Sequence, residues 1–165
     1  MNESSGPVCA VLDLGSNSFH LLIGRLAGGR LVTLDRRKDM VRLAQGLEGD
    51  AQLSEPVMAR ALESLAVFSQ QLRNIPRANV RVVGTNTLRA AHNADVFLER
   101  AEKVIGVPID VISGQEEGRL IFLGVAKGHA SNAIRRLVVD IGGGSTELIV
   151  GRRKAKRVES LFIGC

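Results

Sequence analysis

The stretch with the most evident chemistry is a glycine-rich turn between two apolar runs. Residues 137–139 lead into Asp140, three glycines and Ser145 follow, and Thr146 and Glu147 precede a second apolar run. Glycines there can adopt positive φ and let a ligand approach the backbone, and successive N–H groups form an anion-binding concavity. The two carboxylates at its mouth could hold a metal ion, directly or through water. We interpret the stretch as a phosphate and Mg²⁺ site; the alternative is a hairpin whose glycines serve only turn geometry.

A near-copy of this stretch lies close to the start of the chain. Residues 12–24 align without gaps on residues 139–151, so that Asp13 matches Asp140, and glycine, serine and leucine recur at further positions. Two copies so far apart are not a solenoid. We expect two related subdomains, each offering a phosphate-binding hairpin to a shared cleft.

Two further segments carry candidate catalytic groups. Arg89 follows a predicted strand over 79–84, beyond its carboxyl end, where ligands bind in open α/β sheets. Its guanidinium could reach a phosphate, or it could form a surface salt bridge. Ser113 and Glu116 have the spacing of a capping box. Glu117 could orient and deprotonate a water, or it could be a surface acid favoured by the helix dipole; spacing alone favours the surface acid.

The elements that must position these residues have the pattern of an α/β domain. Apolar runs separated by turn residues predict strands, and apolar residues at helical spacing predict amphipathic helices that cover the sheet. The predicted strands are 8–14, 19–26, 31–36, 79–84, 107–112 and the two apolar runs around residues 142–145, and the helices begin after Ser54, at Asn93 and at Ser113. Residues 38–49 are predicted to be irregular. We predict a first domain over 1–126, a linker over 127–136 and the start of a second domain over 137–165.

Composition narrows the class of partner. The chain has 165 residues, 45% of them hydrophobic, and a net charge of +5, which favours an anionic partner. The absence of tyrosine and tryptophan argues against a base-stacking surface, so no nucleic acid is expected. No apolar run is long enough to span a membrane, and Met1–Pro7 lacks the apolar part of a signal peptide, so we expect a cytoplasmic protein. The basic cluster 152–157 is interpreted as a solvated turn in preference to a polyanion-guiding patch.

Taken together, the motifs resemble the exopolyphosphatase / guanosine pentaphosphate phosphohydrolase family, within the actin-like, sugar-kinase and heat-shock-ATPase superfamily. The resemblance is carried by residues 13–20, 84–89, 112–117 and 140–147. It implies an α/β, actin-like (ribonuclease H-like) fold with a mixed sheet and flanking helices: a first domain plus the opening hairpin of a second. It also implies Mg²⁺-dependent hydrolysis of a terminal phosphoanhydride in polyphosphate or guanosine pentaphosphate, a link to the stringent response, and a homodimer at full length.

The resemblance also implies roles for individual residues. Glu117 would be the general base for the attacking water, and Arg89 would bind and neutralise phosphate. Asp140 and Glu147 would hold the metal, with Asp13 facing them. The positions that would bind phosphate oxygens are Gly15, Ser16, Asn17, Ser18, Thr85, Gly142, Gly143, Gly144, Ser145 and Thr146. Such a site fits phosphoryl transfer, where positioning and charge stabilisation do most of the catalysis.

The sequence departs from the family pattern in two places. Gly118 stands where many members have alanine, and members continue well beyond Cys165. We therefore interpret the sequence as an N-terminal fragment and expect it to be a poor catalyst with an exposed sheet edge.

Two other functions remain open from the sequence. A sugar-kinase-like or actin-like ATPase would share both hairpins, although the segment 113–117 argues against it. A non-enzymatic sensor would bind guanosine tetraphosphate or pentaphosphate, and the retained Glu117 and metal-type carboxylates argue weakly against that role. The sequence does not choose between polyphosphate and the guanosine nucleotide.

Overall fold

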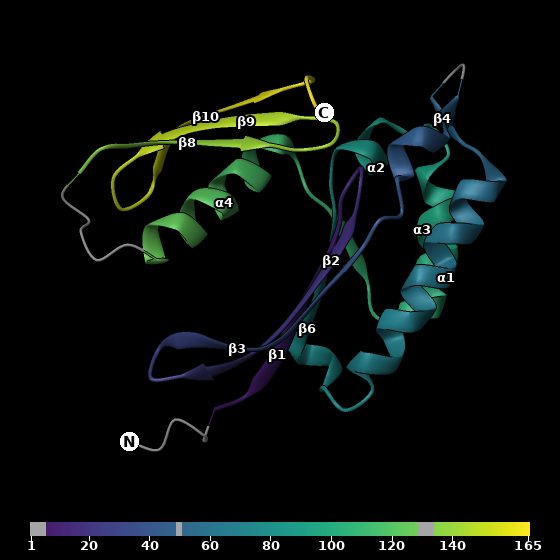
Figure 1. Cartoon of the computed structure of the whole chain (residues 1–165), viewed down its shortest axis with the longest axis horizontal. Coiled ribbons are helices and arrows are strands. Elements are labelled where there is room, and N and C mark those ends of the chain that lie inside the picture. Colours follow the sequence, from purple (N-terminus) through teal and green to yellow (C-terminus); the bar gives the residue numbers. More distant parts are fainter. Residues whose placement is uncertain (1–5, 49–50, 129–133) are drawn as a thin grey trace. The chain divides into compact units, whose positions relative to one another are not determined.

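The computed structural model describes residues 6–48, 51–128 and 134–165. Contacts within it divide the chain into two units, Met1–Val111 and Ile112–Cys165, and Figure 1 shows the elements of each.

The five-stranded sheet of the first unit has the order β3-β2-β1-β6-β7. Its first three strands form an antiparallel meander, and β6 and β7 add to it in parallel. The bounds are β1 Val8–Leu14, β2 Phe19–Ala27, β3 Arg30–Asp39, β6 Val80–Gly84 and β7 Ile109–Val111. The structure confirms that the predicted strands exist. It extends the second and third at their carboxyl ends and shortens those predicted over 79–84 and 107–112 to β6 and β7.

Two long helices, α1 (Glu55–Leu72) and α3 (Ala94–Ile105), run along one face of this sheet in Figure 1. Alternate residues of β1 are buried on that face because successive side chains of a strand point to opposite sides. Helix α3 ends at Ile105, and Gly106, which follows it, adopts the left-handed conformation at φ 78°. Between β6 and α3 lies α2 (Asn86–Ala90), a single helical turn.

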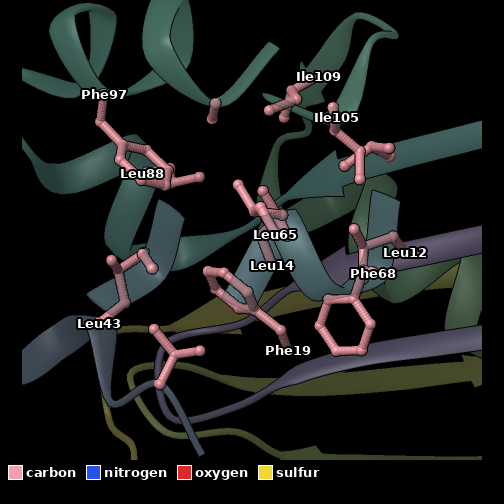
Figure 2. Packing of buried hydrophobic residues seen from close by; sticks show 14 of the residues in the cluster. Leu12, Leu14, Phe19, Leu43, Leu65, Phe68, Leu88, Phe97, Ile105 and Ile109 are labelled. Atoms are coloured by element: carbon pink, nitrogen blue, oxygen red, sulfur yellow. The ribbon is translucent and has the colours of Figure 1, made fainter. Parts of the chain in front are cut away.

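The hydrophobic core of the first unit reaches the end of the sheet where the predicted site residues begin. Leu14 closes β1, Phe19 opens β2 and Leu88 lies on α2; all three belong to one buried cluster with α1 and α3 (Figure 2). The turn between β1 and β2 is therefore anchored on both sides by core residues.

Residues 40–48, which lie within the segment predicted to be irregular (38–49), contain regular structure. A short 3₁₀ helix, Leu43–Gly46, is followed by the ribbon of β4 (Leu47–Glu48) and β5 (Gln52–Leu53). Gly46 packs so closely on α1 that an added Cβ would lie 2.7 Å from Cβ of Val57. Packing against a distant helix is the cause, which local sequence pattern does not reveal.

The second unit contains one helix and a three-stranded antiparallel sheet. The bounds are α4 Gly114–Gly128, β8 Arg136–Ile141, β9 Thr146–Gly151 and β10 Ala155–Leu161, and the strand order is β10-β9-β8. Phe122 of α4 and Ile149 of β9 are buried together in its small core. The basic cluster 152–157 is a turn only as far as residue 154, since β10 begins at Ala155.

The contacts group α4 with the C-terminal strands, whereas the predicted first domain, 1–126, includes most of this helix. Of the predicted linker 127–136, residues 129–133 lie outside the described residues. Lys127 belongs to α4 and Arg136 to β8. The limits of the two domains stay a prediction. Among the described residues, every helix is too short or too polar to cross a bilayer.

Candidate functional site

Turn 1, residues 15–18, joins β1 to β2 and contains four of the predicted phosphate-binding residues. Leu14 pairs with Phe19 at its base, and Asp13 pairs with His20 one step below. A Cβ added to Gly15 would lie 2.8 Å from the carbonyl oxygen of Ser18. Glycine is needed here for close approach within the turn. Gly15 does not adopt a positive φ.

The sheet brings turn 1 together with the segment that carries Thr85 and Arg89. Leu14 pairs in parallel with Gly84, so both strands deliver their following residues to the same end of the sheet. Thr85 is buried at the start of α2 and Arg89 is half-buried near its end. A direct link joins the two segments: the Thr87 hydroxyl donates to Ser16 Oγ at 2.7 Å.

Turn 1 is also held through its backbone by the segment after β3. The amide of Arg42 donates to the carbonyl of Asn17 at 2.8 Å, and the amide of Ala44 donates to that of Ser16 at 2.9 Å. Arg42 adopts the left-handed region at φ 54°, and Arg60 of α1 donates to the carbonyl of Val41 at 2.7 Å. These contacts fix the position of the turn relative to α1.

The last residue of turn 1 contacts an imidazole. Ser18 Oγ and His20 Nε2 lie 2.7 Å apart. Burial lowers the pKa of His20, and the neighbouring charge of Lys38, its partner on β3, lowers it further. The neutral imidazole is therefore favoured opposite Asp13.

Turn 2, residues 142–145, joins β8 to β9 with the same register as turn 1. Ile141 pairs with Thr146 at its base, and Asp140 pairs with Glu147 one step below. A Cβ added to Gly142 would lie 3.1 Å from the carbonyl oxygen of Ser145, and Gly142 likewise lacks a positive φ. The alignment of residues 12–24 with 139–151 is thus also an equivalence of strand pairing.

The carboxylates of Asp140 and Glu147 lie on the face of the second sheet that packs on α4. Glu147 is only 1% exposed, and its Oε1 accepts a hydrogen bond from Ser160 at 2.8 Å. Burial raises the pKa of Asp140, and the charge of Glu147 raises it further. Like charges directly opposite one another on a sheet are destabilising, so this pair favours a proton or a cation.

Helix α4 positions Glu117 within the second unit. Its neighbour Gly118 packs on the sheet: an added Cβ would lie 2.5 Å from Cγ1 of Val158 and 3.6 Å from Cγ of Glu147. Glu117 is half-buried, and its amide donates to the carbonyl of Ser113 at 2.9 Å. Glycine at 118 therefore has a packing reason that the helix pattern alone does not give.

Only one of the two contacts of the predicted capping box is seen, because the side chain of Glu116 pairs with Arg119 instead. The amide of Glu116 donates to Ser113 Oγ at 3.2 Å, as expected. The carboxylate of Glu116 forms a two-pronged ion pair with Arg119, with both N–O distances 2.7 Å. Arg119 thus holds the acid that was expected to cap the helix, and this pair lowers the pKa of Glu116.

Turn 2 and Thr146, the first residue of β9, form hydrogen bonds with the residues after β10. Thr146 Oγ1 donates to the carbonyl of Ile163 at 2.6 Å, and the amide of Cys165 donates to the carbonyl of Gly142 at 3.0 Å. Ser145 is buried. Of the predicted phosphate-binding residues here, Gly143 and Gly144 are half-buried.

The donor set of the second unit fits a divalent cation of the Mg²⁺ type. Mg²⁺ is commonly bound by one or two carboxylates together with water and substrate phosphates, and Asp140 and Glu147 provide two carboxylates that repel each other. No group of three or more histidine, cysteine or acidic side chains lies close enough to bind a metal within the described residues. Any metal there would need further ligands from substrate or water.

Comparison with known proteins decides the family. The sequence model of the Ppx/GppA phosphatase family matches residues 22–165, which is most of the chain. The chain belongs to this family.

Members from two Vibrio species are similar throughout the chain. The guanosine-5'-triphosphate,3'-diphosphate pyrophosphatases of Vibrio campbellii and Vibrio parahaemolyticus are 50% and 51% identical over 163 residues, 98% of this chain. The chain spans about a third, 32%, of the length of these curated relatives.

Solved structures of Ppx/GppA proteins have the same fold. An exopolyphosphatase from Cytophaga hutchinsonii has a TM-score of 0.87 at 34% identity, covering 95% of this chain and 51% of that one. The Aquifex aeolicus family member has a TM-score of 0.84 at 31% identity, covering 97% and 52%. The ethanolamine utilization protein EutJ from Carboxydothermus hydrogenoformans, at 14% identity, 99% and 55% coverage and a TM-score of 0.54, is similar in fold alone. The predicted actin-like α/β fold is confirmed.

Sequence reasoning missed three residues that contact the predicted site. Thr87 and Ser160 donate to predicted site residues, and His20 contacts another. A signal for Thr87 was its place two residues before Arg89 in the same motif. Ser160 has no such signal, because its contact depends on how β10 pairs with β9.

Proposed function

We propose that this chain contributes the phosphate-binding and water-activating residues of a phosphoanhydride hydrolase that releases terminal phosphate from polyphosphate or guanosine pentaphosphate. The observation that carries the proposal is the pair of hairpins with identical register. Each has a carboxylate one step below a four-residue turn, and each opens on a glycine packed against the carbonyl three residues on. Family membership and the names of the relatives support the same reaction class.

Phosphate binding is assigned to the two turns and to α2. The amides of turn 1 and turn 2 would donate to phosphate oxygens, and Thr85 and Arg89 would add a hydroxyl and a guanidinium beside turn 1. Binding the oxygens of the phosphoryl group stabilises the charge that spreads over them in the transition state.

Water activation is assigned to Glu117. A carboxylate that is half-buried at the start of a helix accepts a proton from water while its backbone stays fixed by the helix. Its neighbour Glu116 is held by Arg119 and is not assigned a role in catalysis.

A divalent cation such as Mg²⁺ would be held by Asp140 and Glu147, with Asp13 as a further candidate ligand. When bound, it would neutralise negative charge on phosphate oxygens. Within the chain, Ser160 fixes one oxygen of Glu147, which orients the carboxylate beside Asp140. A homodimer at full length and a cytoplasmic location stay predictions.

The test is phosphate release from long-chain polyphosphate and from guanosine pentaphosphate, each with Mg²⁺, using the chain extended to the length of its relatives. Glu117→Gln is expected to lower kcat at least about a hundredfold, the lower limit for loss of general-base catalysis. Glu116→Gln is the matched control, since it makes the same change one residue away and is expected to leave kcat within about twofold.

Three results would contradict the proposal. Equal loss in both variants would mean that α4 is simply perturbed. Tight binding of guanosine pentaphosphate without phosphate release, unchanged in Glu117→Gln, would favour the sensor. ATP consumption that depends on an added sugar would favour a kinase.

A further inference from the structure

The hydrogen bond between Thr87 and Ser16 joins two segments that lie 71 residues apart in the chain. Both residues are buried, Thr87 at 1% and Ser16 at 5% exposure. A hydroxyl has one proton to donate and can accept at its lone pairs. Because Thr87 donates to Ser16, the Ser16 proton is left to bond elsewhere.

The Thr87–Ser16 bond is a direct polar connection between α2 and turn 1. Leu88 is buried in the core of the first unit, and the amide of Arg89 donates to the carbonyl of Thr85 at 3.1 Å. A helix of five residues has little stability of its own, since nucleation outweighs the bonds it gains. Its orientation must therefore come from such tertiary contacts.

Thr87 and Arg89 lie two residues apart on the single turn of α2. Residues two apart in a helix do not face each other, and Thr87 contacts turn 1 through its hydroxyl. Turn 1 is held on its backbone by Arg42 and Ala44. The Thr87 bond therefore fixes α2 to a turn that is already fixed itself.

We propose that Thr87 is a positioning residue for phosphate binding: its bond to Ser16 sets the place of Arg89 relative to the amides of turn 1. This inference rests on the proposed function, because it assumes that turn 1 and Arg89 bind the same phosphate chain. Thr87 itself does not contact the substrate; it acts through Arg89.

The experiment measures the affinity of tripolyphosphate, with Mg²⁺, for the whole chain by isothermal titration calorimetry. Thr87→Val keeps the shape of the side chain and removes the donor; we expect an affinity loss of about tenfold, equivalent to one well-placed charged contact. Thr87→Ser keeps the hydroxyl and is expected to restore most of the affinity. Thr33→Val, the same change on exposed β3, is the control and is expected to change affinity by less than about twofold.

A double-mutant cycle with Arg89 separates positioning from a general loss of structure. In an Arg89→Ala background, Thr87→Val should cost less than about twofold, because the group it positions is gone. A loss of the same size in both backgrounds would overturn the inference, as would a Thr87→Val variant that is less stable but binds normally.

Failure of the inference is distinguishable from failure of the proposed function. If the unmutated chain binds tripolyphosphate and Thr87→Val binds it equally well, only the inference is wrong. If the unmutated chain does not bind tripolyphosphate, the proposed phosphate site is wrong and the inference fails with it.

Discussion

Turn 1 and turn 2 have the same length and the same strand register but different support. The base of turn 1 is Leu14 paired with Phe19, both in the hydrophobic core, whereas the base of turn 2 is Ile141 paired with Thr146, and Ile141 is 63% exposed. One step below, Asp13 faces His20 in the first hairpin, and Asp140 faces Glu147 in the second.

The two hairpins have equivalent backbones, but the charges on their facing side chains differ. A carboxylate opposite an imidazole has a partner that can be neutral or positive. In the second hairpin, burial and then the facing charge of Glu147 raise the pKa of Asp140, and the two facing carboxylates favour a cation. The second hairpin is therefore the better candidate for the metal.

The largest expected effect tests the bases of the two turns. Phe19→Ala should lower the free energy of unfolding of the first unit by about 3–5 kcal/mol, because it removes a fully buried ring. Ile141→Ala should change that of the second unit by less than about 0.5 kcal/mol, because the side chain is mostly in water. Urea unfolding followed by residue-resolved NMR measures both, and similar losses would mean that both turns have equal support.

The second-largest effect on stability is expected from the polar contacts of the residue pairs one step below the two turns. Ser160→Ala leaves Oε1 of the buried Glu147 without this donor and should cost about 1.5–3 kcal/mol. His20→Ala removes the contact to Ser18 from an exposed side chain and should cost about 0.5–1 kcal/mol. Chemical denaturation of each variant checks the order, and a larger loss in His20→Ala would reverse the comparison.

A smaller effect is expected where α4 packs over Glu147. Gly118→Ala gains helix propensity but forces Val158 aside, and we expect a net loss of about 1 kcal/mol. Gly124→Ala, on the same helix, meets no atom within 4 Å and should gain about 0.5–1 kcal/mol. Thermal unfolding of the two variants shows whether each substitution raises or lowers stability. Stabilisation by both would show that α4 is not tightly packed on the sheet at Gly118.

The smallest effect is a difference in pH response. The folded-state pKa of Asp140 is raised from its ordinary 3.8. Between 3.8 and this raised pKa, the folded second unit keeps a proton that the unfolded chain releases. The stability of the second unit should therefore fall as pH rises from 3.8 through the folded-state pKa. The pKa of His20 is lowered from 6.5, so the first unit should lose stability as pH falls below 6.5. Residue-resolved unfolding between pH 4 and 7 compares the two, and Asp140→Asn should flatten the response of the second unit alone.

Local pattern predicted most of the elements. The bounds of β1 agree with the prediction, β2 is one residue longer, and α3 begins one residue after its predicted start. These features depend on periodicity and turn residues over a few positions, which the sequence displays directly. The ribbon of β4 and β5 was not predicted because it follows a segment that packs on α1. The role of Gly118 was not predicted because it depends on β9 and β10, the strands on which α4 packs.

The sequence predicted which residues belong to the candidate site but not which side chains they contact. The repeat in the sequence determined that two equivalent turns exist and that each follows a carboxylate, and the apolar run over 79–84 determined that Arg89 lies beyond a strand end. The tertiary structure decided what each of these groups meets: Thr87 on Ser16, Ser160 on Glu147 and α4 over the second sheet. Hydrogen-bonded turns form between residues close in sequence, whereas these partners meet only after the sheet and helices have packed, so no local pattern records them.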